Sequence, residues 1–257
     1  MGVKTDGLTD VQWRLVRPVF DPKVRRGRRA RHSRRRMVEA VLWLARTGCR
    51  WRGLPARYGS WVAVWAQWRR WRDKGVWAAA MLRRHQVART NAGRQVEPSL
   101  LMVDAQTVKG RRAGPGFHES GGRGGRTRGT KRTVIVDFLG LPLAATAPSA
   151  RAPDSQVGRA LLNEVLPEHP RVSTVMADRG YRPRAHSVAA KHGVIVDIRY
   201  VERGPGFQPV QPLWKVEDCF AKIGAWRRMS RCFEGSQAAA AGWRQVACVG
   251  VLLAATR

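Results

Sequence analysis

The stretch Ser99–Lys109, "SLLMVDAQTVK", places one acid, Asp104, directly behind four apolar residues. A short apolar run of this kind is typical of a buried strand, so we expect Asp104 at or inside that strand. An ionised carboxylate in a buried position is costly unless a cation or a metal ion compensates its charge. The stretch therefore predicts either an ion pair or a functional acid.

The composition of the whole chain makes this acid unusual. The 257 residues include 48 Lys and Arg but only 18 Asp and Glu, which gives a formal net charge of +30. Such an excess favours a polyanionic partner, and nucleic acid is the usual one, with an anionic membrane surface as the rival. The chain contains no run of about 18 apolar residues, the length needed to span a bilayer. Its N-terminus lacks the apolar core of a signal peptide. We therefore expect a soluble cytoplasmic protein that acts on DNA or RNA.

The four cysteines form no Cys-x-x-Cys pair, so neither a zinc site nor a disulfide framework is indicated. The first part of the chain has helical patterns over residues 8–20, 37–51 and 59–75. In the third of these, one face carries Trp61, Val64, Trp65, Trp68 and Trp71, while Gln67 and three arginines are expected to point elsewhere. The tryptophan face predicts core packing. Two helices joined by "RGLPARYGS" also suit a helix-turn-helix, with the later helix entering a major groove.

A basic arm, "RRGRRARHSRRR" (Arg25–Arg36), precedes the second helix and has no core-forming pattern. It could follow a minor groove or only contact phosphates, and the sequence does not separate these alternatives. The arginine face of the third helix could likewise be simply solvated. The candidate DNA contacts in this part of the chain are Arg25, Arg26, Arg28, Arg29, Arg34, Arg35, Arg69, Arg70 and Arg72.

From Pro98 onward the hydrophobic period changes to that of strands. Strands are predicted over residues 100–108, 172–181 and 194–201, with a hairpin over 133–148 that turns near Leu139 and Gly140. Helices are predicted over 154–166, 182–193, 213–233 and 238–255, with Asp154 as the cap of the first. A Gly/Arg loop covers 110–132. This order predicts a mixed α/β sheet with helices packed on it.

Three acids stand out by their positions in these elements. Asp104 follows one apolar strand run, Asp178 ends another, and Glu217 lies early in a helix. Acids from separate elements that converge at one sheet form an all-oxygen site suited to Mg²⁺, and two such ions can promote phosphoryl displacement. From spacing alone, helix caps and ion pairs with the many arginines explain these acids equally well. Asp137, before the hairpin turn, is interpreted as structural.

Several ordered motifs resemble a known family. "LTDVQWRLVRPVF", "VLWLARTGCRWRGLP" and "WRRWRDKGVW" resemble the N-terminal helical domain of bacterial transposases of the insertion-sequence-five group. "MVDAQTVKG", "GTKRTVIVDFLGLPLA", "ADRGY" and "WKVEDCFAKIGAWRRMSRCFE" are similar, in order, to the catalytic domain of that group. The resemblance implies an RNase H-like, retroviral-integrase-like fold. It also implies a helical DNA-binding domain at residues 1–95 and a catalytic domain at 96–257.

The resemblance further implies a reaction and its site. Asp104, Asp178 and Glu217 match the Asp-Asp-Glu triad, whose acids hold two Mg²⁺ (or Mn²⁺) ions. The enzyme would bind terminal inverted repeats, cut the ends of the element and join them to target DNA. A homodimer or larger assembly that acts on the bacterial nucleoid is implied. The alternatives are a nuclease or resolvase of the same fold, and a weakened copy that mainly binds DNA.

The chain departs from the family pattern just before the tryptophan that precedes Glu217. The family has one or two arginines there, whereas this chain has Pro212 and Leu213. Lys215, Arg227 and Arg228 are expected to supply positive charge instead. In the Gly/Arg loop, either the basic residues grip DNA phosphates or the loop is merely solvated; these residues are Arg126, Arg128, Lys131 and Arg132.

Overall fold

The computed structural model describes residues 7–22, 32–110, 118–120, 127–199 and 212–255. Its centre is a six-stranded sheet in the order β2-β3-β1-β5-β6, with β4 also paired to β3. The central strand β1 runs antiparallel to β3 and parallel to β5. The strands are β1 (Leu100–Lys109), β2 (His118–Ser120), β3 (Thr127–Asp137), β4 (Pro142–Thr146), β5 (Thr174–Asp178) and β6 (Ile195–Arg199).

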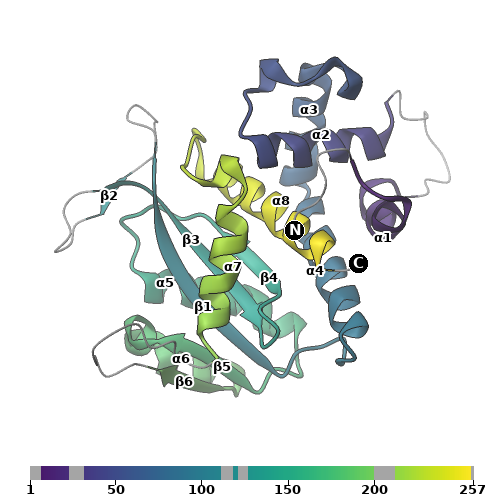
Figure 1. Cartoon of the computed structure of the whole chain (residues 1–257). Helices are drawn as coiled ribbons and strands as arrows, with labels where there is room; N and C mark the ends of the chain where they lie inside the picture. The colour runs from purple at the N-terminus through teal and green to yellow at the C-terminus, as the bar shows by residue number, and fades with distance from the viewer. Residues whose placement is uncertain (1–6, 23–31, 111–117, 121–126, 200–211, 256–257) are drawn as a thin grey trace.

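Helices cover both faces of this sheet (Figure 1). Alternate residues of a strand point to opposite faces, and β1 follows this rule. Leu101 and Val103 pack in a cluster with α5 and α6, whereas Met102 packs in a second cluster with α7 and α8. The helices are α5 (Asp154–Val165), α6 (Arg182–His192), α7 (Trp214–Gly224) and α8 (Gln237–Ala254). The predicted mixed α/β architecture, with an RNase H-like sheet, is confirmed.

The N-terminal part is helical, as predicted. Its helices are α1 (Asp10–Phe20), α2 (Arg34–Thr47), α3 (Trp61–Asp73) and α4 (Val76–Asn91). Thr9 begins α1 with a capping box, in which its hydroxyl accepts from the Gln12 amide. Gly48 ends α2 in the left-handed conformation, with φ of 68°, which glycine adopts without steric cost. The predicted bounds of the second helix, residues 37–51, are wrong at both ends: α2 begins at Arg34, so the last three residues of the predicted basic arm are helical, and it ends at Thr47. Helix α4 was not predicted.

Val64, Trp68 and Trp71 of the predicted tryptophan face of α3 pack in the core. Trp61 and Trp65 are only half-buried and lie outside this cluster, so the prediction that the whole face packs in the core is wrong for these two residues. The partners of the buried rings are distant in sequence. Trp68 stacks on Trp243 of α8 with ring centroids 4.9 Å apart, and Trp71 meets Phe20 of α1 edge-on. One hydrophobic cluster consequently runs from Leu8 to Leu253 and crosses the predicted boundary at residues 95 and 96. The helical part and the sheet share this core.

The prediction that Gln67 points away from the core is wrong. Its side chain is 5% exposed and accepts hydrogen bonds from Arg34 at 2.6 Å and Arg70 at 2.9 Å. These two guanidinium groups satisfy the amide oxygen, which lowers the cost of burying it. Amphipathic spacing cannot reveal such a partner, because Arg34 lies in another helix.

Two further boundaries differ from the prediction. The helix predicted over residues 213–233 ends at Gly224, and a short 3-10 helix, Arg227–Met229, follows. The loop predicted over 110–132 contains the first part of β3, which pairs with the end of β1. Gly129 permits this pairing because any Cβ there would overlap the Val108 carbonyl. None of the helices in the described parts of the chain is long and apolar enough to cross a bilayer.

Asp137 joins the helical part to the sheet. It is fully buried, accepts a short hydrogen bond from Arg89, and lies 3.2 Å from Nε2 of His85. Its other oxygen accepts from the backbone amides of Leu139 and Leu141, in the turn between β3 and β4. The residue therefore fixes the hairpin turn and holds α4 against it, which is the structural role predicted for it.

Candidate active site

Asp104 and Asp178 lie side by side on the two central parallel strands. Val103 of β1 pairs with Ala177 of β5, so each acid is the next residue along its strand. Alternation places both side chains on the face that Met102 and Met176 occupy, which α7 and α8 cover. Asp104 is half-buried and Asp178 is exposed. Two of the three predicted acids are therefore neighbours on one face.

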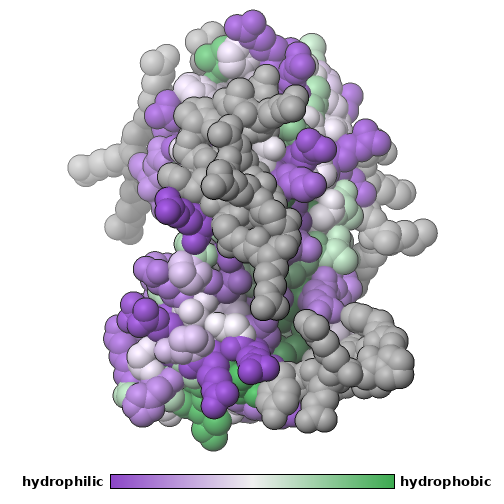
Figure 2. Space-filling view, turned by 90° about the vertical axis from the view of Figure 1, so that its left-hand side faces the viewer, coloured by the Kyte–Doolittle hydropathy of each residue, from purple (hydrophilic) through white to green (hydrophobic). Residues whose placement is uncertain are grey.

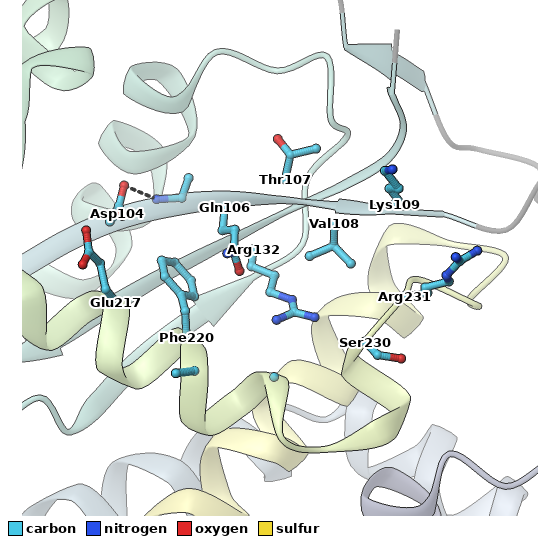
Figure 3. Close-up of a pocket in the computed structure, with 13 residues that line it drawn as sticks. Asp104, Gln106, Thr107, Val108, Lys109, Arg132, Glu217, Phe220, Ser230 and Arg231 are labelled. Carbon is cyan, nitrogen blue, oxygen red and sulfur yellow. Dashed lines mark hydrogen bonds between the residues drawn. The ribbon is translucent and has the colours of Figure 1, made fainter. Parts of the chain in front are cut away.

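Glu217 reaches the same face from α7. Val216, Phe220 and Ile223 are buried and attach this helix to the sheet, which leaves Glu217 exposed in the first turn. Glu217 and Asp104 line one groove of about 780 Å³ between β1 and α7, and Figure 3 shows both carboxylates at the same end of it. Asp178 is not among the residues that line this groove.

The electrostatics of these acids are unfavourable without a cation. Burial raises the pKa of Asp104 to about 7, against a hydrogen bond from the Ala105 amide, and the charges of Asp178, Asp154 and Glu217 add to the rise. Burial also raises the pKa of Asp178. Within the described ranges, no Lys, Arg or His forms an ion pair with Asp104, Asp178 or Glu217. In a chain of net charge +30, these three acids thus have no basic partner among the residues that the structure describes.

The donor chemistry of the three acids fits a divalent metal ion. All ligands would be carboxylate oxygens, which Mg²⁺ and Mn²⁺ prefer. The oxygens are not gathered into one coordination sphere, because no group of three His, Cys, Asp or Glu side chains among the described residues could hold an ion as it stands. Metal binding would therefore need side-chain rearrangement: Glu217 is exposed, whereas Asp178 would keep or give up the hydrogen bond that it accepts from the Gly180 amide at 2.9 Å.

Asp154 lies near this group and was interpreted only as a helix cap. Pro153 occupies the cap position, and Asp154 is the first residue of α5. It forms an ion pair of 2.5 Å with Lys131 of β3, and its charge contributes to the raised pKa values of Asp104 and Asp178. Lys131, predicted as a phosphate contact, is thus already paired. Sequence spacing carried no signal for this pair.

Tyr181 is a second residue near the acids that sequence reasoning did not select. Its hydroxyl is buried and has no hydrogen-bond partner among the described residues. Burial raises the pKa of Tyr181, and the charges of Asp104, Asp154 and Asp178 raise it further. The ring packs directly on Gly158 of α5, where a Cβ would overlap it. Its position three residues after Asp178 was the available signal.

The predicted basic residues of the catalytic part divide into paired and unpaired ones. Lys215 donates to the Phe138 carbonyl at 2.6 Å, and Arg228 pairs with Glu234 at 2.8 Å. Arg227 is exposed, and Arg132 is buried in the wall of the groove. The backbone of Arg128 lies in β3, but its side chain and all of Arg126 are outside the described residues.

In the helical part, internal contacts engage several predicted DNA-binding arginines. Arg34 donates to Gln67, Arg35 pairs with Asp10 and Glu39, and Arg72 pairs with Asp73. Arg69 and Arg70 are exposed on α3, although Arg70 also donates to Gln67 and the Arg69 guanidinium lies 4.8 Å from the centre of the Trp65 ring. The remaining predicted contacts lie outside the described residues; they are Arg25, Arg26, Arg28 and Arg29. Hydrophilic residues predominate over the described part of the face in Figure 2.

Comparisons with known proteins identify two family models that match successive parts of the chain. Residues 8–81 match a family model described as "Putative transposase of IS4/5 family", and residues 96–205 match the model of the transposase DDE domain. The second match includes Asp104 and Asp178 but ends before Glu217. DDE domains of this kind generally use divalent metal ions.

Two curated relatives are similar to part of the chain. An uncharacterized protein, y4sN, of Sinorhizobium fredii is 34% identical over 122 residues, which are 47% of this chain and 89% of the relative. The insertion element IS402 uncharacterized 16.2 kDa protein of Burkholderia cepacia is 34% identical over 115 residues, which are 42% of this chain and 76% of the relative.

Proposed function

Because this chain belongs to the IS4/5 family of insertion-element transposases, we propose that it moves DNA by binding the terminal inverted repeats of an element, cutting its ends and joining them to target DNA. Asp104, Asp178 and Glu217 are the proposed catalytic metal ligands. The observation that carries this proposal is the gathering of these acids on one face of the sheet, without a basic partner among the described residues.

The three acids would hold Mg²⁺ or Mn²⁺, with two ions in the active state. Two bound ions supply the positive charge that stabilises the attacking and leaving oxygens of an in-line displacement. The chain itself positions the ligands: β1 and β5 fix the two aspartates in register, and the buried face of α7 holds Glu217 at the end of the groove. No side chain need act as a nucleophile.

DNA recognition is assigned to the helical part and to the rim of the groove. The exposed arginines of α3, Arg69 and Arg70, are placed to contact DNA if α2 and α3 act as a helix-turn-helix. Arg227 is the corresponding exposed residue near α7. Because two DNA ends must be brought together, we expect a dimer or larger assembly during the reaction, acting in the bacterial cytoplasm at the nucleoid.

A second candidate function is a catalytically weakened copy that mainly binds DNA. The specific observation in its favour is that two of the three expected substitutes for the family's missing arginines, Lys215 and Arg228, are held by contacts within the chain, which leaves only Arg227 of the three exposed. A nuclease of the same fold would cut the ends without joining them.

The experiment compares the full chain with the D104A variant on DNA that carries the ends of the element, as found beside the gene. We expect the unmodified protein to cut these ends in Mg²⁺ and to stop when EDTA is added. D104A should still bind the ends but should not cut them. Cleavage by D104A would refute the triad, and binding without cleavage by the unmodified protein would favour the weakened copy.

A further inference from the structure

Arg132 is a buried arginine at the candidate active site. It lies on β3 opposite Gln106 of β1, and it points to the same face as Val134, two residues further along. Its side chain is 5% exposed and lines the groove that Asp104 and Glu217 also line. Figure 3 shows its guanidinium in this groove, beyond Phe220 as seen from Asp104.

No hydrogen bond or ion pair satisfies this guanidinium within the described residues. The neighbouring Arg244 of α8 is buried to the same extent, but it donates to the carbonyls of Lys131 and Thr146 and to the Thr130 hydroxyl. Burial lowers the pKa of Arg132, so the positive charge is held at a cost. The fold therefore satisfies one of two adjacent arginines and leaves the other facing a groove.

Its sequence neighbour does not share this property. Lys131 points to the opposite face of β3, where Asp154 binds its ammonium group at 2.5 Å. Lys131 is therefore already neutralised from α5, whereas Arg132 has no anionic partner in the described part of the chain. The groove continues past Arg132 to two further basic side chains, Lys109 and Arg231.

We propose that Arg132 binds one phosphate of a single DNA strand that enters this groove and leads away from the candidate acids. The identity of the acids rests on the proposed function. A guanidinium offers two parallel N–H donors that match a phosphate, and this pairing is strong where water is excluded. Asp104 and Lys109 are five residues apart in β1, or roughly 17 Å of extended strand, which allows more than one phosphate along the path.

The size of the groove favours one strand over a duplex. Its volume of about 780 Å³ is in the usual range for small-ligand sites, roughly 300–1,000 Å³. The proposal consequently requires that the DNA end be unpaired where it passes between β1 and α7. A duplex would contact only the rim, and it would depend less on a buried arginine.

Binding of a short oligothymidylate by the full chain in EDTA tests this proposal without catalysis. We expect R132M to bind on the order of ten-fold more weakly than the unmodified protein. The plot of log K, the association constant, against log salt concentration has a negative slope. This slope should become shallower by about 0.7, as expected for the loss of one single-strand phosphate contact. R132K should lie between the two, since it keeps the charge but loses the paired donors.

Thermal unfolding of the same variants without DNA separates a ligand site from a structural role. We expect the Tm of R132M to equal or exceed that of the unmodified protein, because the variant removes a buried charge that lacks a partner. The matched control is R244M, which should lower the Tm by removing hydrogen bonds to three acceptors.

Three results would overturn the proposal: unchanged binding by R132M, a lowered Tm of R132M, or an equal loss of affinity for a blunt duplex of the same length. Failure of the proposed function gives a different pattern. In that case the unmodified protein does not cut its element ends, while R132M still weakens binding of the single strand.

Discussion

At the scale of single residues, Asp104 is an acid whose charged form the fold disfavours. An asparagine at this position would avoid the repulsion from neighbouring acids and the cost of burying a charge. The residue type and its place behind "LLMV" were evident from the sequence. The proximity of Asp154 and Tyr181 was not, because it depends on how α5 and the end of β5 meet beside β1.

The raised pKa of Asp104 predicts a pH-dependent gain in stability for D104N. The folded value of about 7 exceeds the ordinary value near 4, so ionisation opposes folding, and its cost is fully present above about pH 7. In EDTA at pH 8, we expect D104N to be more stable by on the order of 1–3 kcal/mol, with little difference near pH 4. Thermal unfolding across this pH range measures the effect, and a D104N variant less stable at pH 8 would argue against it.

At the scale of elements, local end signals explain which boundaries were predictable. The capping residue Thr9 and the left-handed Gly48 mark the limits of α1 and α2 in the sequence itself. Helix α4 lacked a clear apolar stripe because Arg84, His85 and Arg89 occupy buried positions on it. The first part of β3 was predicted as a loop. It becomes a strand by pairing with β1, and the local sequence pattern gives no sign of this pairing.

The attachment of α4 to the hairpin turn should depend on Asp137. Burial alone would raise the pKa of Asp137, but His85, Arg89 and the Leu141 amide hold it below its ordinary value. The ionised Asp137 carboxylate therefore contributes to stability above about pH 4, and this contribution is lost as the pH falls through the lowered pKa of Asp137. We expect D137A to lower the free energy of unfolding by roughly 3–5 kcal/mol at pH 7, because Arg89 is left buried without its partner.

Urea unfolding of D137A and of a control, D218A, measures this cost. Asp218 is partly exposed and, among the described residues, pairs with Lys222 alone, so its loss should change the free energy of unfolding by less than about 1 kcal/mol. Equal effects of the two substitutions would show that the buried cluster does not hold α4 in place.

At the scale of the whole molecule, the order of helical and strand patterns was sufficient to predict the α/β class, and the motif order was sufficient to predict the family. The sharing of one core between the helical part and α8 was not predictable. Trp68 and Trp243 stack although 175 positions separate them (243 − 68 = 175), and hydrophobic spacing says nothing of such a pairing. The division at residues 95 and 96 therefore stays a prediction, because one core continues across it.

This shared core predicts one cooperative unfolding transition. W243A should lower the free energy of unfolding by about 3–5 kcal/mol. The substitution removes a fully buried ring of α8 that packs against Trp68 of α3 and against Trp51. The midpoint of unfolding followed by helical circular dichroism and the midpoint followed by tryptophan fluorescence should shift by the same amount in this variant. Two separate transitions, with only one of them shifted, would indicate that the helical part folds independently.

Two adjacent carboxylates on α7 test whether Glu217 completes a metal site with Asp104 and Asp178. Cleavage of terminal-repeat DNA in Mg²⁺ is measured for E217Q and D218N, which change the same turn of α7 by the same chemical step. We expect E217Q to bind DNA but to lose cleavage by at least two orders of magnitude, while D218N cuts at the rate of the unmodified protein. Full cleavage by E217Q, or loss of cleavage in D218N alone, would show that Glu217 is not a metal ligand.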